Sequence, residues 1–130
     1  MTALIRINHE GQFSKITDGD AVANALPVGD VASHDQITTL LDQPIVRLQV
    51  DGFADGRGFS VARQLRLLGF AGVIEVIGDL LPDQLPMAAA SGIDAILIRT
   101  EHARRCEESH WRLKSGDKNR FGYQRSVAGG

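Results

Sequence analysis

The sequence has a single cysteine and no long apolar run, and these absences exclude several classes of protein. Cys106 has no second cysteine with which to form an internal disulfide, so a disulfide-stapled extracellular domain is not expected. No stretch approaches the roughly 18 consecutive apolar residues of a membrane span. Residues 1–8 also lack the apolar core of a secretory signal. We therefore expect a cytoplasmic protein without a membrane partner.

A strong excess of charge of one sign is also missing. The formal net charge is -2, with 43% hydrophobic and 23% charged residues, which is ordinary for a globular protein and does not indicate nucleic-acid binding. Positive charge is concentrated at the end, because residues 111–130 hold five basic side chains and one acidic one. That segment therefore carries +4, which leaves -6 for residues 1–110.

The length of 130 residues fits one domain with its own core and is too short for a complete eight-stranded barrel of about 250 residues. We expect a single α/β domain over residues 1–110 and a basic, flexible tail over residues 111–130. The tail is either a solvated terminus or a segment that binds an acidic partner or surface.

The first third of the chain predicts a hairpin, a loop and one helix. Leu4, Ile5 and Ile7 precede a polar break at residues 9–12, and Phe13 and Ile16 follow, so a hairpin should turn at Gly11 and cover one edge of a sheet. Residues 17–32 predict a loop with at most a brief turn or strand. Residues 33–36 have the spacing of a capping box, with serine first and glutamine last, which predicts a helix over residues 34–42.

From residue 44 the chain alternates between strand and helix patterns. Apolar runs predict strands over residues 44–50, 73–77 and 93–98, and helical spacing predicts helices over residues 60–68 and 100–110, the latter capped by Thr100. A helix ending at Ser91 should lie between the last two strands. It begins either after Asp83 as N-cap, with Pro86 in its first turn, or earlier with a bend.

Short connections between such units predict right-handed crossovers and a small parallel sheet covered by helices. An open layered sheet and a partial-barrel arrangement both fit the spacing of the units. In either arrangement the loops that follow the strands meet at the carboxyl edge of the sheet, where α/β proteins bind ligands. The polar residues placed there are Asp51, Asp55, Arg57 and Ser60 from the first loop, Asp79 and Gln84 from the second, and Arg99, Thr100 and Glu101 from the third.

The first of these loops, residues 51–60, is the densest cluster of chemistry in the chain. Its three glycines allow backbone geometry closed to other residues, and Gly56-Arg57-Gly58 could hold an anion at a helix start. The alternative is that Asp55 pairs with Arg57 and caps the helix. The loop lacks the third glycine of a dinucleotide fingerprint and the ending of a P-loop, so no nucleotide or other cofactor is expected.

Asp55 and Asp79 are the candidate acid or base residues, because a carboxylate in a cleft can transfer protons when its pKa is shifted. For Asp79 the alternative is an ordinary helix N-cap, which contributes about 1 kcal/mol.

Three potential metal ligands recur every four residues at His102, Cys106 and His110. Such a row on one helix rarely converges on one ion, so no metal is expected. We expect Cys106 to pack inward with Ala103 and the histidines to face solvent. The aromatic residues near the tail, which are Trp111, Phe121 and Tyr123, should dock the terminus onto the domain.

Several segments in the middle half of the chain share the order and spacing of a bacterial protein family. They are Phe53-Ala54-Asp55-Gly56-Arg57-Gly58-Phe59-Ser60-Val61-Ala62, Leu65-Arg66, Gly69-Phe70-Ala71-Gly72, Gly78-Asp79-Leu80-Leu81-Pro82-Asp83-Gln84-Leu85 and Gly92-Ile93-Asp94-Ala95. The chain resembles a family of unknown function whose members are encoded beside assimilatory sulfite or nitrite reductase and are sometimes described as probable oxidoreductases. This chain departs from it in two prolines and an alanine run at residues 82–90 and in a longer, more basic tail.

The resemblance and the polar edge together give three hypotheses. The first is an accessory protein of sulfur assimilation that binds a sulfite reductase component or a small anion around Asp55, Gly56, Arg57, Gly58 and the other edge residues. The second is a small enzyme in which Asp55 or Asp79 acts as acid or base while Arg57 holds a phosphate or sulfate group. The third is a non-catalytic oligomeric scaffold, since a short sheet with a free edge favours self-association into a homo-oligomer.

Overall fold

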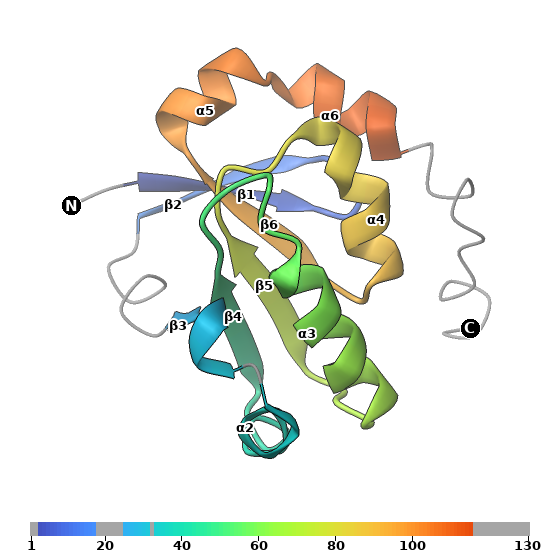
Figure 1. Cartoon of the computed structure of the whole chain (residues 1–130). Helices are drawn as coiled ribbons and strands as arrows, with labels where there is room; N and C mark the ends of the chain where they lie inside the picture. The colour runs from blue at the N-terminus through green and yellow to red at the C-terminus, as the bar shows by residue number, and fades with distance from the viewer. Residues whose placement is uncertain (1–2, 18–24, 32, 116–130) are drawn as a thin grey trace.

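The computed structural model describes residues 3–17, 25–31 and 33–115, and within them one six-stranded sheet is ordered β2-β1-β6-β5-β4-β3 (Figure 1). Its strands are β1 (Ala3–Asn8), β2 (Phe13–Thr17), β3 (Leu26–Pro27), β4 (Ile45–Gln49), β5 (Val73–Ile77) and β6 (Ala95–Arg99). The helices are α2 (His34–Thr38), α3 (Arg57–Leu67), α4 (Leu85–Ala90), α5 (Thr100–Arg105) and α6 (Glu108–Ser115), with short 3-10 turns η1 (Val28–Val31) and η2 (Pro82–Gln84).

The sheet is open and mixed. Strands β3, β4, β5 and β6 run parallel, whereas β1 is antiparallel to both β6 and β2. The α/β class and the N-terminal hairpin are confirmed, and Gly11 occupies the hairpin turn with φ of 80°. Because β2 and β3 lie at opposite edges, the open layered arrangement holds and the partial barrel is wrong.

The core lies mainly between one face of the sheet and the helices, as the alternation of side chains along buried strands requires (Figure 1). Strand residues such as Val76 and Ile96 pack there with Ile37 from α2, Leu65 from α3 and Ala88 from α4. A smaller cluster on the opposite face is formed by Leu4, Ile77, Ala95 and Leu97.

Two predicted helices differ from the observed ones at their ends. The capping box at Ser33 and Gln36 is present, but α2 ends at Thr38 instead of residue 42. Helix α3 begins at Arg57, three residues before the expected start, with Gly56 as an N-cap that makes no side-chain hydrogen bond. The Asp55 carboxylate accepts from the Arg57 amide at 3.3 Å. Gly69 follows α3 with φ of 94°, as expected of a residue after a helix end.

The two prolines divide the expected helix before β6. Pro82 begins η2, and α4 starts afterwards with Gln84 as N-cap and Pro86 in its first turn. Asp83 as the N-cap is therefore wrong, while the position of Pro86 is confirmed. A proline in the first turn removes no helical hydrogen bond, which explains why α4 tolerates it.

The helix expected over residues 100–110 is wrong, because the chain forms α5 and α6 with a break at Cys106. The N-cap of α5 is Arg99, not Thr100. The break lets Trp111 turn into the core, where it is fully buried and its indole nitrogen donates to the Cys106 carbonyl at 2.9 Å. The boundary expected at residue 110 falls inside α6, and residues 116–130 lie outside the described residues.

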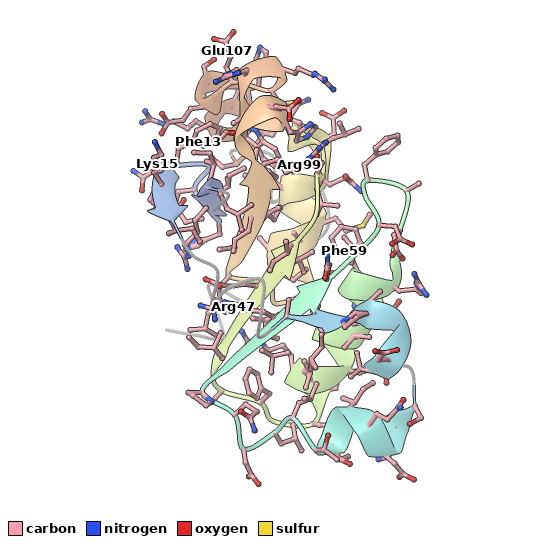
Figure 2. The ribbon with its side chains drawn as sticks, turned by 90° about the vertical axis from the view of Figure 1, so that its left-hand side faces the viewer. Phe13, Lys15, Arg47, Phe59, Arg99 and Glu107 are labelled. Atoms are coloured by element: carbon pink, nitrogen blue, oxygen red, sulfur yellow. The ribbon has the colours of Figure 1, made fainter. Side chains whose placement is uncertain are left out.

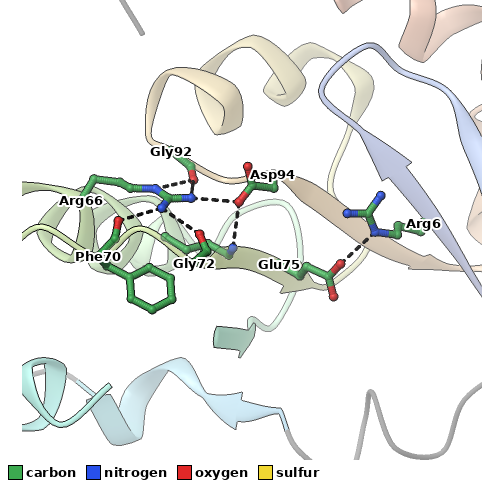
Figure 3. Close-up of polar contacts among 8 residues, drawn as sticks. Arg6, Arg66, Phe70, Gly72, Glu75, Gly92 and Asp94 are labelled. Atoms are coloured by element: carbon green, nitrogen blue, oxygen red, sulfur yellow. Dashed lines mark hydrogen bonds and ion pairs between the residues drawn. The ribbon is translucent and has the colours of Figure 1, made fainter. Parts of the chain in front are cut away.

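Arg66 on α3 holds the amino ends of β5 and β6 together (Figure 3). Its guanidinium donates to the carbonyls of Phe70, Gly72 and Gly92 at 2.9 Å and to the Asp94 carboxylate at 2.8 Å. A planar group with five donors suits such a cluster of acceptors. These hydrogen bonds explain how the amino ends of the two strands are aligned. The role of the Arg66 side chain is therefore structural.

Glu75 on β5 is a buried carboxylate held between two arginines. Its oxygens accept from Arg6 Nε on β1 and Arg47 Nε on β4, each at 2.8 Å, and its side chain is 7% exposed. Burial of an unpaired carboxylate would be costly, so both ion pairs are needed for Glu75 to occupy the sheet.

We predict that Glu75→Gln lowers the free energy of unfolding by about 3 kcal/mol, because it leaves two half-buried guanidiniums without their acid. Urea denaturation measures the change. The matched control is Asp83→Asn, which removes the pair with Lys114 from a carboxylate that is 74% exposed and should cost at most about 1 kcal/mol. An equal, small change in both variants would contradict the structural role of Glu75.

Candidate functional site

The loops after β4, β5 and β6 meet at the carboxyl edge of the sheet, as the sequence predicts, and Arg99 stands at the end of β6 (Figure 2). Asp55 lies in the first loop and Asp79 in the second. Each of these three residues makes an ion pair at this edge. The candidate residues therefore lie at the same edge, but most of them form ion pairs with each other.

In the first loop, Asp55 and Arg57 form a two-point ion pair. Arg57 Nε donates to Asp55 Oδ1 at 2.8 Å and Arg57 Nη2 donates to Oδ2 at 2.9 Å. The same carboxylate accepts from the amides of Asp51 and Arg57. Arg57 also lies 3.6 Å from the exposed Asp51 carboxylate. The expected pairing of Asp55 with Arg57 is therefore observed, but the N-cap of α3 is Gly56, and Asp55 contributes only by accepting from the amide of the first helical residue.

This pairing fixes the protonation of both groups. The hydrogen bond from Arg57 lowers the pKa of Asp55 well below its ordinary value, with the two backbone amides adding to the effect and burial opposing it. The Asp55 carboxylate in turn raises the pKa of Arg57. Asp55 is thus an ionised acceptor near neutral pH, which is the opposite of the raised pKa that a general acid needs.

Backbone geometry closed to other residues was the expected explanation for the glycines of this loop, and it does not hold for all three. Gly56 has φ of -79° and open space around it, so neither backbone nor packing demands glycine there. Gly58 is buried, and a Cβ there would lie 3.0 Å from Val50, so it allows α3 to approach β4 closely. Gly52, with φ of 146°, is the loop residue whose backbone favours glycine.

Asp79 joins the second loop to the third. Its carboxylate accepts from the Arg99 amide at 3.1 Å and from Arg99 Nε at 2.6 Å. Arg99 is the N-cap of α5. Asp79 therefore accepts hydrogen bonds at the start of α5, which follows the neighbouring strand, and not at the start of the helical segment that follows Asp79 in sequence. The Asp79 carboxylate also raises the pKa of Arg99.

Gln84 connects the first two loops. Its side-chain amide donates to the Phe53 carbonyl at 2.8 Å, and its oxygen accepts from the Leu81 amide at 2.8 Å. Ser60, the remaining candidate of the first loop, is exposed on the first turn of α3. Phe53 itself is 58% exposed, and sequence reasoning did not select it, although an aromatic residue in a glycine-rich loop is a recognisable signal.

Two adjoining hollows occupy this edge, and both are lined by Asp51 and Asp79. The first, of about 370 Å³, has an apolar floor that includes Ile77 and Leu97. The second, of about 450 Å³, is bounded by the loop that carries Phe53. The edge is therefore concave, with an apolar floor and an acidic rim.

The charge balance of the edge is negative. Asp51, Asp55, Asp79 and the exposed Glu101 contribute four carboxylates, against the two guanidiniums of Arg57 and Arg99. Both arginines already donate to carboxylates at 2.9 Å or less. An arrangement of this kind attracts basic groups more than anions.

Comparison with known proteins places the chain in a family. Residues 21–129 match the profile of a bacterial protein of unknown function, DUF934. The chain belongs to the DUF934 family. No curated protein and no solved structure gives a significant match. In the described part of this DUF934 chain, no helix is long and apolar enough to cross a membrane.

The row of potential metal ligands on α5 and α6 has other roles. His102 is buried and its Nε2 lies 2.6 Å from the Leu80 carbonyl, so the expectation that it faces solvent is wrong. Cys106 and Ala103 pack against the core as expected, and His110 is exposed. Among the described residues of the DUF934 chain, no three His, Cys, Asp or Glu side chains are placed to hold a metal ion.

Of the aromatic residues expected to dock the terminus, Trp111 is in the core of the DUF934 chain. The other two, Phe121 and Tyr123, lie outside the described residues.

We predict that the Asp55 carboxylate stabilises the DUF934 fold at neutral pH and loses this contribution in acid. Because its folded pKa is depressed, the contribution is fully present above the ordinary value of 3.8 and is lost progressively as the pH falls from there toward the lower pKa of the folded state. Urea denaturation of wild type and Asp55→Asn from pH 7 to pH 2.5 measures the difference. The difference between the two stabilities should narrow steadily below the ordinary pKa of 3.8, and a difference that stays constant down to pH 2.5 would contradict the ion pair.

Proposed function

We propose that this DUF934 protein is a non-catalytic accessory protein of assimilatory sulfite reduction, which binds a component of the reductase through its loop edge. The family resemblance motivates the metabolic assignment. The geometry of the edge motivates binding, through an exposed aromatic side chain beside an apolar hollow with an acidic rim.

The observation that carries the proposal is the exposure of Phe53 on a loop that is anchored on both sides. Gln84 holds the Phe53 carbonyl from η2, and the Asp55–Arg57 pair fixes the chain just beyond it. An aromatic side chain on a preorganised loop loses little conformational entropy on binding, and such residues dominate the energy of protein interfaces.

The partner surface should carry an apolar pocket for Phe53 beside basic side chains. Acidic groups at Asp51 and Asp79 surround the hollows, so a basic rim on the partner would complement them and speed association. The same charges argue against a small anion at the Gly56-Arg57-Gly58 segment, because Arg57 is neutralised there by Asp55 and Asp51.

The enzyme hypothesis has less support. The lowered pKa of Asp55 keeps it ionised and bonded to Arg57, and Asp79 accepts from both the backbone and the side chain of Arg99. A general acid needs a retained proton, and an arginine paired with a carboxylate stabilises the ionised form, which makes that carboxylate a weaker base. Self-association into a homo-oligomer stays a prediction and is compatible with partner binding.

We predict that Phe53→Ala weakens binding to the purified sulfite reductase component roughly thirtyfold, because truncating a central interface aromatic costs about 2 kcal/mol. Isothermal titration calorimetry gives the dissociation constant. Leu67→Ala is the matched control, since Leu67 is 80% exposed near the end of α3, among the residues that line a separate hollow with Ala90 and Gly92.

Leu67→Ala should bind as wild type does. Equal affinity of wild type and Phe53→Ala would exclude the loop edge as the interface. Absence of binding by the wild type to every reductase component would refute the accessory function itself.

A further inference from the structure

Glu75 accepts hydrogen bonds from only one nitrogen of each of the two arginines that flank it. Both ion pairs are made by the Nε atoms, at 2.8 Å from the two Glu75 oxygens. Figure 3 shows the bond from Arg6, which starts at Nε. No side chain or backbone oxygen of the described residues accepts from the terminal nitrogens of Arg6 or Arg47.

The sheet register explains how both guanidiniums reach one carboxylate. Arg47 and Glu75 are direct partners on the neighbouring parallel strands β4 and β5. Arg6 comes from β1, on the far side of β6, which places Ala95 opposite Glu75. Because the β6 partner of Arg6 is Leu97 and that of Glu75 is Ala95, the Arg6 side chain reaches Glu75 diagonally across β6. The three charged groups therefore share one face of the sheet.

This group of three carries an uncompensated positive charge, because two guanidiniums flank one carboxylate. The side chains of Arg6 and Arg47 are 32% and 22% exposed, so their charge is less hydrated than on an open surface. The neighbouring positions in the sheet are neutral. Ser14 lies opposite Arg6, and the pair of Gln49 and Ile77 is the next one on this face after Arg47 and Glu75. Partly buried positive charge with free donors favours an anion that accepts from it.

We propose that Arg6 and Arg47 bind a small oxyanion or carboxylate on this face of the sheet, with Glu75 as the positioning residue that spaces the two guanidiniums. The terminal nitrogens donate to the anion oxygens, and the Nε atoms stay on Glu75. Planar, forked donors of this kind match oxyanions such as sulfate, sulfite and phosphate, as well as carboxylates.

The site is distinct from the loop edge and does not rest on the proposed function. At the loop edge, carboxylates occupy Arg57 and Arg99 at both Nε and a terminal nitrogen. On the sheet face, one carboxylate is shared by two arginines through Nε. The anion expected from the sequence at Arg57 is thus better matched by Arg6 and Arg47.

Isothermal titration calorimetry of the full chain with sodium sulfate, sulfite, phosphate and acetate, at constant ionic strength set with sodium chloride, tests the proposal. The wild type should bind at least one of these anions in preference to chloride. Arg47→Gln should weaken that binding roughly tenfold, because a charge-assisted hydrogen-bonding partner is lost. Arg47→Lys keeps the charge and the pair with Glu75 and should give a smaller loss.

Arg63→Gln is the matched control, because Arg63 is an exposed arginine of α3 away from this face, and it should bind anions as the wild type does. Phe53→Ala should also leave anion binding unchanged, which separates this site from the partner surface. Binding no stronger than that of chloride in the wild type, or unchanged affinity in both Arg47 variants, would overturn the proposal.

Discussion

The two-point ion pair between Asp55 and Arg57 fixes the loop that follows β4. The Asp55 carboxylate accepts from the amide of Arg57, the first residue of α3, which begins three residues earlier than the apolar pattern predicts. Through its bond from the Asp51 amide it closes the loop on itself and so presents Phe53. The wall of the second hollow and the position of Phe53 depend on this contact together with the bond from Gln84 to the Phe53 carbonyl. These contacts together therefore turn a glycine-rich segment into a defined surface.

The arginines of this chain divide by how completely carboxylates neutralise them. At the loop edge the pairing is complete and acids are in excess, which suits a basic protein partner. On the sheet face Glu75 is shared between Arg6 and Arg47, so positive charge is in excess. The two places therefore suit two kinds of ligand, a protein at the edge and a small anion on the face.

The sequence was sufficient where structure depends on neighbours in the chain. The apolar runs predict β4, β5 and β6, and the capping box at Ser33 predicts the start of α2. It was insufficient where structure depends on register between distant strands, because no local pattern shows that Arg6 and Glu75, 69 residues apart, lie on one face. The break before α6 was missed for the same reason, since it depends on the core position that Trp111 fills.

The central claim concerns the described residues, in which carboxylates engage Arg57 and Arg99 at both Nε and a terminal nitrogen but engage Arg6 and Arg47 only at Nε. The terminal nitrogens of Arg6 and Arg47 are therefore the proposed anion donors. The most direct test records the side-chain ¹H–¹⁵N signals of the arginines by nuclear magnetic resonance while sulfate is added at constant ionic strength. We expect saturating shifts at Arg6 and Arg47, with the signals of Arg57 and Arg99 unchanged. Saturating shifts confined to Arg57 and Arg99 would contradict this claim and would return the anion site to the loop edge.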